Sequence, residues 1–76
     1  MPDTYTARVA AEVRAAMARH GRTSRDLATI LNVSAPTARA RWGGSRPYTV
    51  EEVDRIAEAL GVPVLDLLMS PHQPAA

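Results

Sequence analysis

Apolar residues recur every three or four positions in five segments of this chain, which is the spacing of amphipathic helices. In the first segment, Val9, Val13 and Met17 lie at successive helical turns and predict a helix over about residues 6–20. No segment shows the alternation of apolar and polar residues that a half-buried strand requires. The pattern therefore predicts an all-α, compact domain of five helices.

Residues that favour helix ends set the bounds of the next two helices. Thr23 suits the N-cap of a helix over residues 24–31, and Asn32 follows where the chain must turn, since asparagine tolerates the left-handed conformation. Ser34 is placed to cap a third helix over residues 35–42. Two short helices joined by a tight turn are typical of a helix-turn-helix, whose second helix enters the major groove of DNA.

The second half of the chain carries similar signals. A threonine-glutamate capping box at residues 49–52 predicts a fourth helix that ends before Gly61, and a short fifth helix is expected to begin at Pro63. The apolar stripe expected to bury the fourth helix consists of Val50, Val53, Ile56, Ala57 and Leu60. We therefore expect one domain over residues 1–69 and a flexible tail over residues 70–76, which hold two prolines and no large apolar side chain.

The composition excludes several classes of protein. A chain of 76 residues, 46% of them hydrophobic, can form one domain with one small core. It has no cysteine, which excludes disulfides and thiolate metal sites. No apolar run approaches the roughly 20 residues of a membrane-spanning helix, and the N-terminus lacks the features of a secretory signal. We therefore expect a cytoplasmic protein, in a bacterial cell or a phage-infected host.

Charge is distributed unevenly, although the formal net charge is only +1. Residues 19–47 hold six arginines against one aspartate, whereas residues 48–76 hold five acids against one arginine. All nine basic residues are arginine, whose planar guanidinium suits phosphates and guanine edges. A compositional bias toward arginine explains the number of arginines but not their clustering. The basic half coincides with the predicted helix-turn-helix and indicates a nucleic-acid partner.

Helical geometry separates two faces of the predicted third helix. At about 100° per residue, Ala38 and Trp42 share the core side. The opposite face carries Pro36, Arg39, Ala40 and Gly43. Arg39 is the one long side chain among small residues there, so we expect it to reach a guanine edge. Arg41 lies on the flank of the core side, where it can reach a phosphate or pair with an acid of the first or fourth helix.

Three stretches carry a family resemblance, namely TSRDLATILNVS, ARARWGG and RPYTVEEVDRIAEALGVPVLDLL. Together they resemble the lambdoid phage repressor and Cro type of helix-turn-helix protein (the XRE-like family) over roughly residues 8–68. The last stretch is also similar to repressors of actinobacteria and their phages. The resemblance implies a five-helix all-α domain that binds double-stranded DNA.

The resemblance also implies roles for single residues. The positions that read bases are Ala35, Pro36, Arg39 and Ala40. Phosphate contacts are implied for Ser24, Thr37, Ser45 and Arg46, to which we add Arg25, Arg41 and Gly43 as candidates. The chain departs from the family pattern where Asn32 replaces the usual turn glycine and Arg41 occupies a usually apolar position. Ala35 and Pro36 replace longer polar readers, so recognition is expected to depend on Arg39 and on DNA shape.

The remaining polar and aromatic positions favour no other chemistry. Trp42 fits core packing better than base stacking, because it falls at core spacing. Glu51, Asp54 and Glu58 share one helix face but have no further ligand beside them, so a solvated face is favoured over a metal site. The two histidines fall at a helix end and in the tail, away from any triad geometry. We expect no catalytic residue, metal or cofactor.

These observations predict a small transcriptional repressor, of the phage immunity or Cro type, that binds double-stranded DNA and occludes a promoter. The alternative is an antitoxin-like module that binds a toxin and regulates its own operon. No small-molecule ligand or membrane contact is expected. A weak homodimer is expected at least on DNA, through whichever residues of the fifth helix the core leaves exposed among Val64, Leu65, Leu67 and Leu68.

Overall fold

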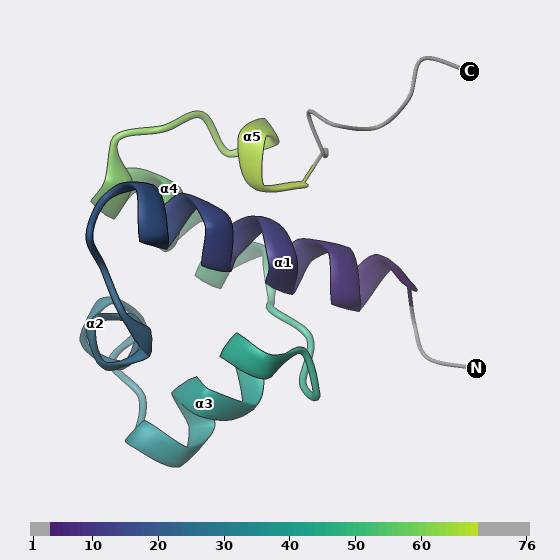
Figure 1. The fold of residues 1–76 in the computed structure, drawn as a ribbon, viewed down its shortest axis with the longest axis vertical. Coiled ribbons are helices and arrows are strands. Elements are labelled where there is room, and N and C mark those ends of the chain that lie inside the picture. The colour runs from purple at the N-terminus through teal and green to yellow at the C-terminus, as the bar shows by residue number, and fades with distance from the viewer. Residues whose placement is uncertain (1–3, 69–76) are drawn as a thin grey trace.

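The computed structural model describes residues 4–68, which form helices joined by short turns and contain no strand (Figure 1). The helices are α1 (Thr4–Arg19), α2 (Ser24–Leu31), α3 (Ala35–Gly43), α4 (Val50–Leu60) and α5 (Leu65–Leu68). The predicted all-α class and the five helices are confirmed. The tail expected over residues 70–76 lies outside the described part of the chain.

The polar residues at the predicted helix ends form the expected caps. The Thr23 amide donates to Asp26 Oδ2 at 2.9 Å, and Ser34 Oγ accepts from the Thr37 amide at 3.3 Å. Asn32 follows α2 with a φ of 58°, in the left-handed region that asparagine tolerates at low cost. The local signals therefore place both ends of the turn between α2 and α3.

Helix α1 lies across the middle of the molecule, with α3 on one side, α5 on the other and α4 behind it (Figure 1). Helix α2 packs against both α3 and α4. Buried residues from all five helices meet in one apolar cluster, as a domain of this size requires. The main members are Val9, Val13, Met17, Leu27, Leu31, Ala38, Val53, Ile56, Leu60 and Leu67.

Several details of the helices differ from the sequence-based expectation. Val50 was expected in the core but is 79% exposed, because the first turn of α4 lies at the margin of the cluster. Trp42 is half-buried and packs against the cluster without entering it fully. Helix α5 begins at Leu65, since Pro63 belongs to a preceding turn in which its carbonyl accepts from the Asp66 amide at 3.0 Å.

Candidate DNA-binding surface

Helices α2 and α3 have the arrangement of a helix-turn-helix. In Figure 1, α2 is viewed end-on while α3 runs across the page, so the two helices cross steeply. Leu27 and Leu31 of α2 and Ala38 of α3 are buried in the shared core. The turn is closed by the Val33 amide, which donates to the Ala28 carbonyl at 3.0 Å. One edge of α3 is thus anchored, and its other edge is left to solvent.

The outer edge of α3 is the one that helical geometry predicted. Ala38 is 1% exposed and faces inward, whereas Pro36 and Arg39 are exposed on the opposite side. Ala35 is also exposed, and Ala40 is half-buried. Small residues around one long arginine let the helix backbone come close to a surface that fits it, with Arg39 extending furthest.

An open groove between α2 and α3 brings together residues that the sequence assigned to two different roles. Its lining consists of Ser24, Arg25, Ala28, Ala35 and Arg39. The two alanines contribute only methyl groups, while the two guanidinium groups supply positive charge at the same groove. Such a groove can accept an anionic or hydrogen-bond-accepting group, including a phosphate or a base edge.

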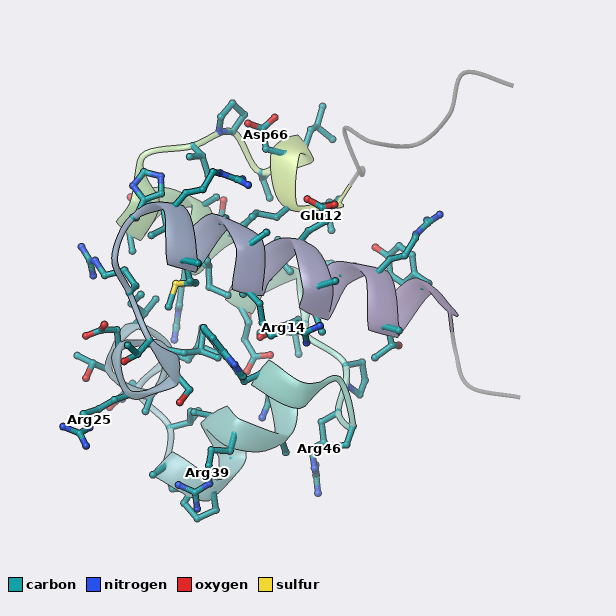
Figure 2. The ribbon with its side chains drawn as sticks, in the orientation of Figure 1. Glu12, Arg14, Arg25, Arg39, Arg46 and Asp66 are labelled. Carbon is teal, nitrogen blue, oxygen red and sulfur yellow. The ribbon has the colours of Figure 1, made fainter. Side chains whose placement is uncertain are left out.

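Three exposed arginines lie on one side of the molecule. Arg25, Arg39 and Arg46 lie on the side formed by α2, α3 and the loop after α3, whereas Glu12 of α1 and Asp66 of α5 lie on the opposite side (Figure 2). None of these three arginines makes an ion pair with another residue of the described range 4–68. Their charges therefore remain available to an external anion.

The loop after α3 is folded back onto the helix. Gly44 ends α3 with a φ of 86°, a conformation that glycine adopts without strain. The Ala40 carbonyl then accepts from the Ser45 hydroxyl at 3.1 Å and from the Arg46 amide at 3.3 Å. The proton of the Ser45 hydroxyl is therefore engaged within the protein, whereas the Arg46 side chain is exposed. Of the two, the Arg46 side chain is the one left free to meet an external anion.

The other predicted phosphate contacts differ in what they can offer. Thr37 Oγ1 accepts from Ser34 Oγ at 2.9 Å, which leaves the Thr37 hydroxyl proton for an external acceptor. Ser24 is half-buried in the groove, and Gly43 is exposed at the end of α3. These positions are compatible with contacts to a nucleic-acid backbone.

The structure places Arg41 differently from its predicted phosphate contact. Its Nε donates to Glu52 Oε1 of α4 at 2.8 Å, and the two side chains are only 15% and 14% exposed. The Nη1 atom of Arg41 is buried and has no partner among the described residues. Because Arg41 projects from the flank of the core face, it meets the first turn of α4 instead of solvent. Pairing with an acid of the fourth helix, the other sequence-based alternative, is what the structure contains.

Two further polar residues near the end of α3 were missed by the sequence reasoning. Arg14 of α1 donates from Nη1 to the Trp42 carbonyl at 2.7 Å. The available signal was its place at helical spacing between the buried Ala10 and Met17. Tyr48 has a buried hydroxyl without a partner in residues 4–68, and this burial raises its pKa well above the usual value.

The predicted self-association residues divide into two groups. Leu67 is 1% exposed and belongs to the core, so it is not among the residues that the core leaves exposed for a dimer contact. Val64 and Leu68 are half-buried against the core, while Leu65 is 59% exposed. The turn that replaces the first part of the predicted helix directs Leu67 inward and Leu65 outward.

Residues 4–68 contain no cluster of three or more histidine, aspartate or glutamate side chains placed to hold a metal ion. Glu51, Asp54 and Glu58 are all exposed along α4. None of the helices that the structure describes combines the length and apolar character needed to cross a membrane.

Comparison with known proteins places the chain in a family. Neither a curated protein nor a solved structure matches it. The BetR domain matches residues 5–76, which is nearly the whole chain and includes all of α2 and α3. The chain is therefore a member of the BetR domain family.

Proposed function

We propose that this protein is a sequence-specific double-stranded DNA-binding transcriptional repressor. The observation that carries the proposal is the groove between α2 and α3, where Arg25 and Arg39 are exposed and unpaired within the described chain. The crossing of the two helices and the exposed outer edge of α3 support it further. A surface of this shape and charge suits the major groove of DNA.

In the proposed complex, α3 lies in the major groove and Arg39 donates two hydrogen bonds to guanine O6 and N7. Ala35, Pro36 and Ala40 supply close apolar contact around it. Thr37, Arg25 and Arg46 bind phosphates and set the register of the protein on the duplex. Repression follows by occlusion, since an operator that overlaps a promoter cannot hold this protein and polymerase together. The phage immunity and Cro types of repressor act in this general way.

The test is selection of bound duplexes from a randomised library by the purified protein, followed by footprinting of the DNA upstream of its own gene. We expect enrichment of a short motif that contains guanine and protection of a site in the upstream DNA. Equal binding of all library members, with no protected site, would contradict the proposal.

An antitoxin-like module is the second candidate. The observation in its favour is the exposed Leu65 beside Asp66 on the side away from the groove, where a second protein could bind without displacing DNA. Co-expression with the product of the neighbouring gene, followed by size-exclusion chromatography of the purified proteins, tests this candidate. A stable complex that also protects the host from that product would favour the antitoxin assignment.

A further inference from the structure

Two charge-assisted hydrogen bonds join the last turn of α3 to two other helices, α1 and α4. Arg14 Nη1 of α1 donates to the Trp42 carbonyl at 2.7 Å, and Arg41 Nε donates to Glu52 Oε1 of α4 at 2.8 Å. In Figure 2, the Arg14 side chain extends from α1 toward this end of α3. The Trp42 carbonyl belongs to the end of a helix, where carbonyls lack helical partners and a cation is favoured. Helices α1 and α4 therefore both hold the same turn.

The Glu52 carboxylate is itself fixed in position. Its Oε1 atom also accepts from the Thr49 amide at 2.9 Å, and the Glu52 amide donates to Thr49 Oγ1 at 3.1 Å. The same oxygen thus serves both the capping box of α4 and the bond to Arg41. The capping box defines where α4 begins. The bond from Arg41 to Glu52 therefore attaches α3 to a fixed position at the start of α4.

Close backbone packing accompanies these bonds. A Cβ atom added at Gly44 would lie 3.4 Å from the Ala10 Cβ, and the positive φ of Gly44 already disfavours any side chain there. The end of α3 is thus seated directly on α1. Movement of this turn would require the Arg14 bond, the Arg41 bond and the contact at Gly44 to change together.

Stability alone is a poor explanation for the arrangement. The Arg41 and Glu52 side chains are largely removed from water, and Arg41 Nη1 and Tyr48 Oη are buried without partners in residues 4–68. Burying a charge pair with a donor left unsatisfied incurs a desolvation cost that often cancels the attraction. Such a pair can still define one orientation of the helix that carries it.

The residues that depend on this orientation lie on both sides of the held turn. Arg39 precedes Arg41 by two positions on the same rigid helix, and Arg46 follows in the loop that folds back on α3. Recognition sites lose function when their groups move by more than about 0.5 Å. A change in the tilt of α3 would move Arg39 away from its base and Arg46 away from its phosphate on the DNA.

We propose that Arg14, Arg41 and Glu52 are positioning residues for α3, which orient the proposed DNA-reading face and do not contact DNA themselves. This inference rests on the proposed DNA-binding function. Sequence discrimination then depends on three side chains that lie behind the reading face. For Arg41, this positioning role replaces the expected phosphate contact.

The test compares Glu52→Gln with Glu51→Gln, an exposed neighbour in the same first turn of α4. Both variants remove one negative charge, and glutamine at position 52 still supports a capping box. The probes are the duplex selected by the wild-type protein and a scrambled duplex of equal length at the same salt. Binding is measured by fluorescence anisotropy, and folding by thermal unfolding.

Removal of an acid should slightly strengthen binding to any DNA, because repulsion of phosphates falls. We expect Glu51→Gln to follow that rule on both duplexes. We expect Glu52→Gln to bind the selected duplex about tenfold more weakly while its affinity for the scrambled duplex is kept. If Glu52→Gln binds the selected duplex as tightly as Glu51→Gln, the positioning proposal is overturned.

A double-mutant cycle with Arg41→Met distinguishes positioning from phosphate contact. For a positioning pair, the double variant loses no more discrimination than either single variant, because each substitution removes the charge attraction between Arg41 and Glu52. If Arg41 instead contacts a phosphate, Arg41→Met alone would weaken binding to the scrambled duplex. It would also lower the slope of log affinity against log salt concentration by roughly one unit. That result would overturn the proposal for Arg41.

Two further controls keep the outcomes separate. If Glu52→Gln is unfolded at the assay temperature, Arg14→Met replaces it, with the exposed Arg19→Met as its control, and the same loss of discrimination is expected. Retained discrimination in Arg14→Met would then overturn the proposal. If the wild-type protein itself prefers no duplex, the proposed function fails and the positioning inference fails with it. If the wild-type protein prefers the selected duplex and the variants prefer it equally, the positioning inference is refuted and the proposed function stands.

Discussion

Arg39 and Arg41 lie two positions apart on α3 and have opposite environments. Arg39 is exposed at the groove with α2 and makes no ion pair within residues 4–68, whereas Arg41 is paired with Glu52 and largely buried. Two positions on a helix turn through about 200°, so neighbouring arginines of one segment face opposite directions. The two arginines therefore differ in role although they are chemically alike. Arg39 is accessible to a ligand, whereas Arg41 attaches the helix to the rest of the domain.

Arg39→Ala is expected to cost about 1–3 kcal/mol of binding free energy on the selected duplex and to relax preference at one guanine. Arg46→Ala should instead weaken all duplexes alike, because a phosphate contact carries no sequence information. Anisotropy titrations over a panel of single-base variants measure both effects. Identical profiles for the two variants would refute the separate base and phosphate roles.

DNA binding is expected to weaken steeply with salt. Each phosphate neutralised by an arginine adds about 0.9 to the slope of log affinity against log salt concentration. Arg25, Arg39 and Arg46 are the exposed cations on the proposed face, so Arg46→Ala should lower the slope by about one unit. Asp54→Asn, on the exposed side of α4, serves as the control. A flat salt dependence in the wild type would contradict a DNA-binding role.

Trp42→Ala is expected to destabilise the domain by about 3 kcal/mol, since the half-buried indole packs against the core. The Trp42 backbone carbonyl accepts from Arg14 Nη1, and the substitution changes only the side chain, so that hydrogen bond stays in place. Urea unfolding monitored by circular dichroism measures the loss. A variant with unchanged stability and lost DNA affinity would move Trp42 from the core to the binding surface.

Tyr48→Phe is expected to maintain or raise stability at neutral pH, by up to about 1 kcal/mol, because the buried hydroxyl has no partner among the described residues. Burial raises the pKa of this phenol above its ordinary value of 10.0. The unfolded chain therefore loses the proton first as pH rises, and wild-type stability should fall above about pH 10. Unfolding curves between neutral and alkaline pH test both points. A similar alkaline loss in Tyr48→Phe would contradict the assignment.

Two copies are expected on a palindromic site, with half-sites about 34–36 Å apart. Leu65 is the exposed leucine of α5, so Leu65→Asp should reduce two-copy binding on DNA, without unfolding the domain. Val50→Asp, at an exposed valine in the first turn of α4, is the matched control. Analytical ultracentrifugation with and without the selected duplex measures the stoichiometry. Loss of the second copy only in Val50→Asp would place the contact at the start of α4 instead of at Leu65.

The sequence by itself determined the helices and the outward face of α3. Caps and turns act over three or four residues, so Thr23, Asn32, Ser34 and the capping box at residues 49–52 were sufficient to bound α2, α3 and α4. The spacing around Ala38 was likewise sufficient to direct Arg39 outward, because a helix has a fixed angular period.

The tertiary structure alone decided which groups meet across helices. A helical wheel places Arg41 on a flank but does not say whether solvent, DNA or Glu52 lies beside it. The same limit applies to Arg14, whose partner is a backbone carbonyl 28 positions away, and to Val50 and Leu67, whose exposure depends on where the core ends. Local signals act within one turn of helix, whereas these contacts depend on how the helices pack around α1, which couples residues far apart in the chain.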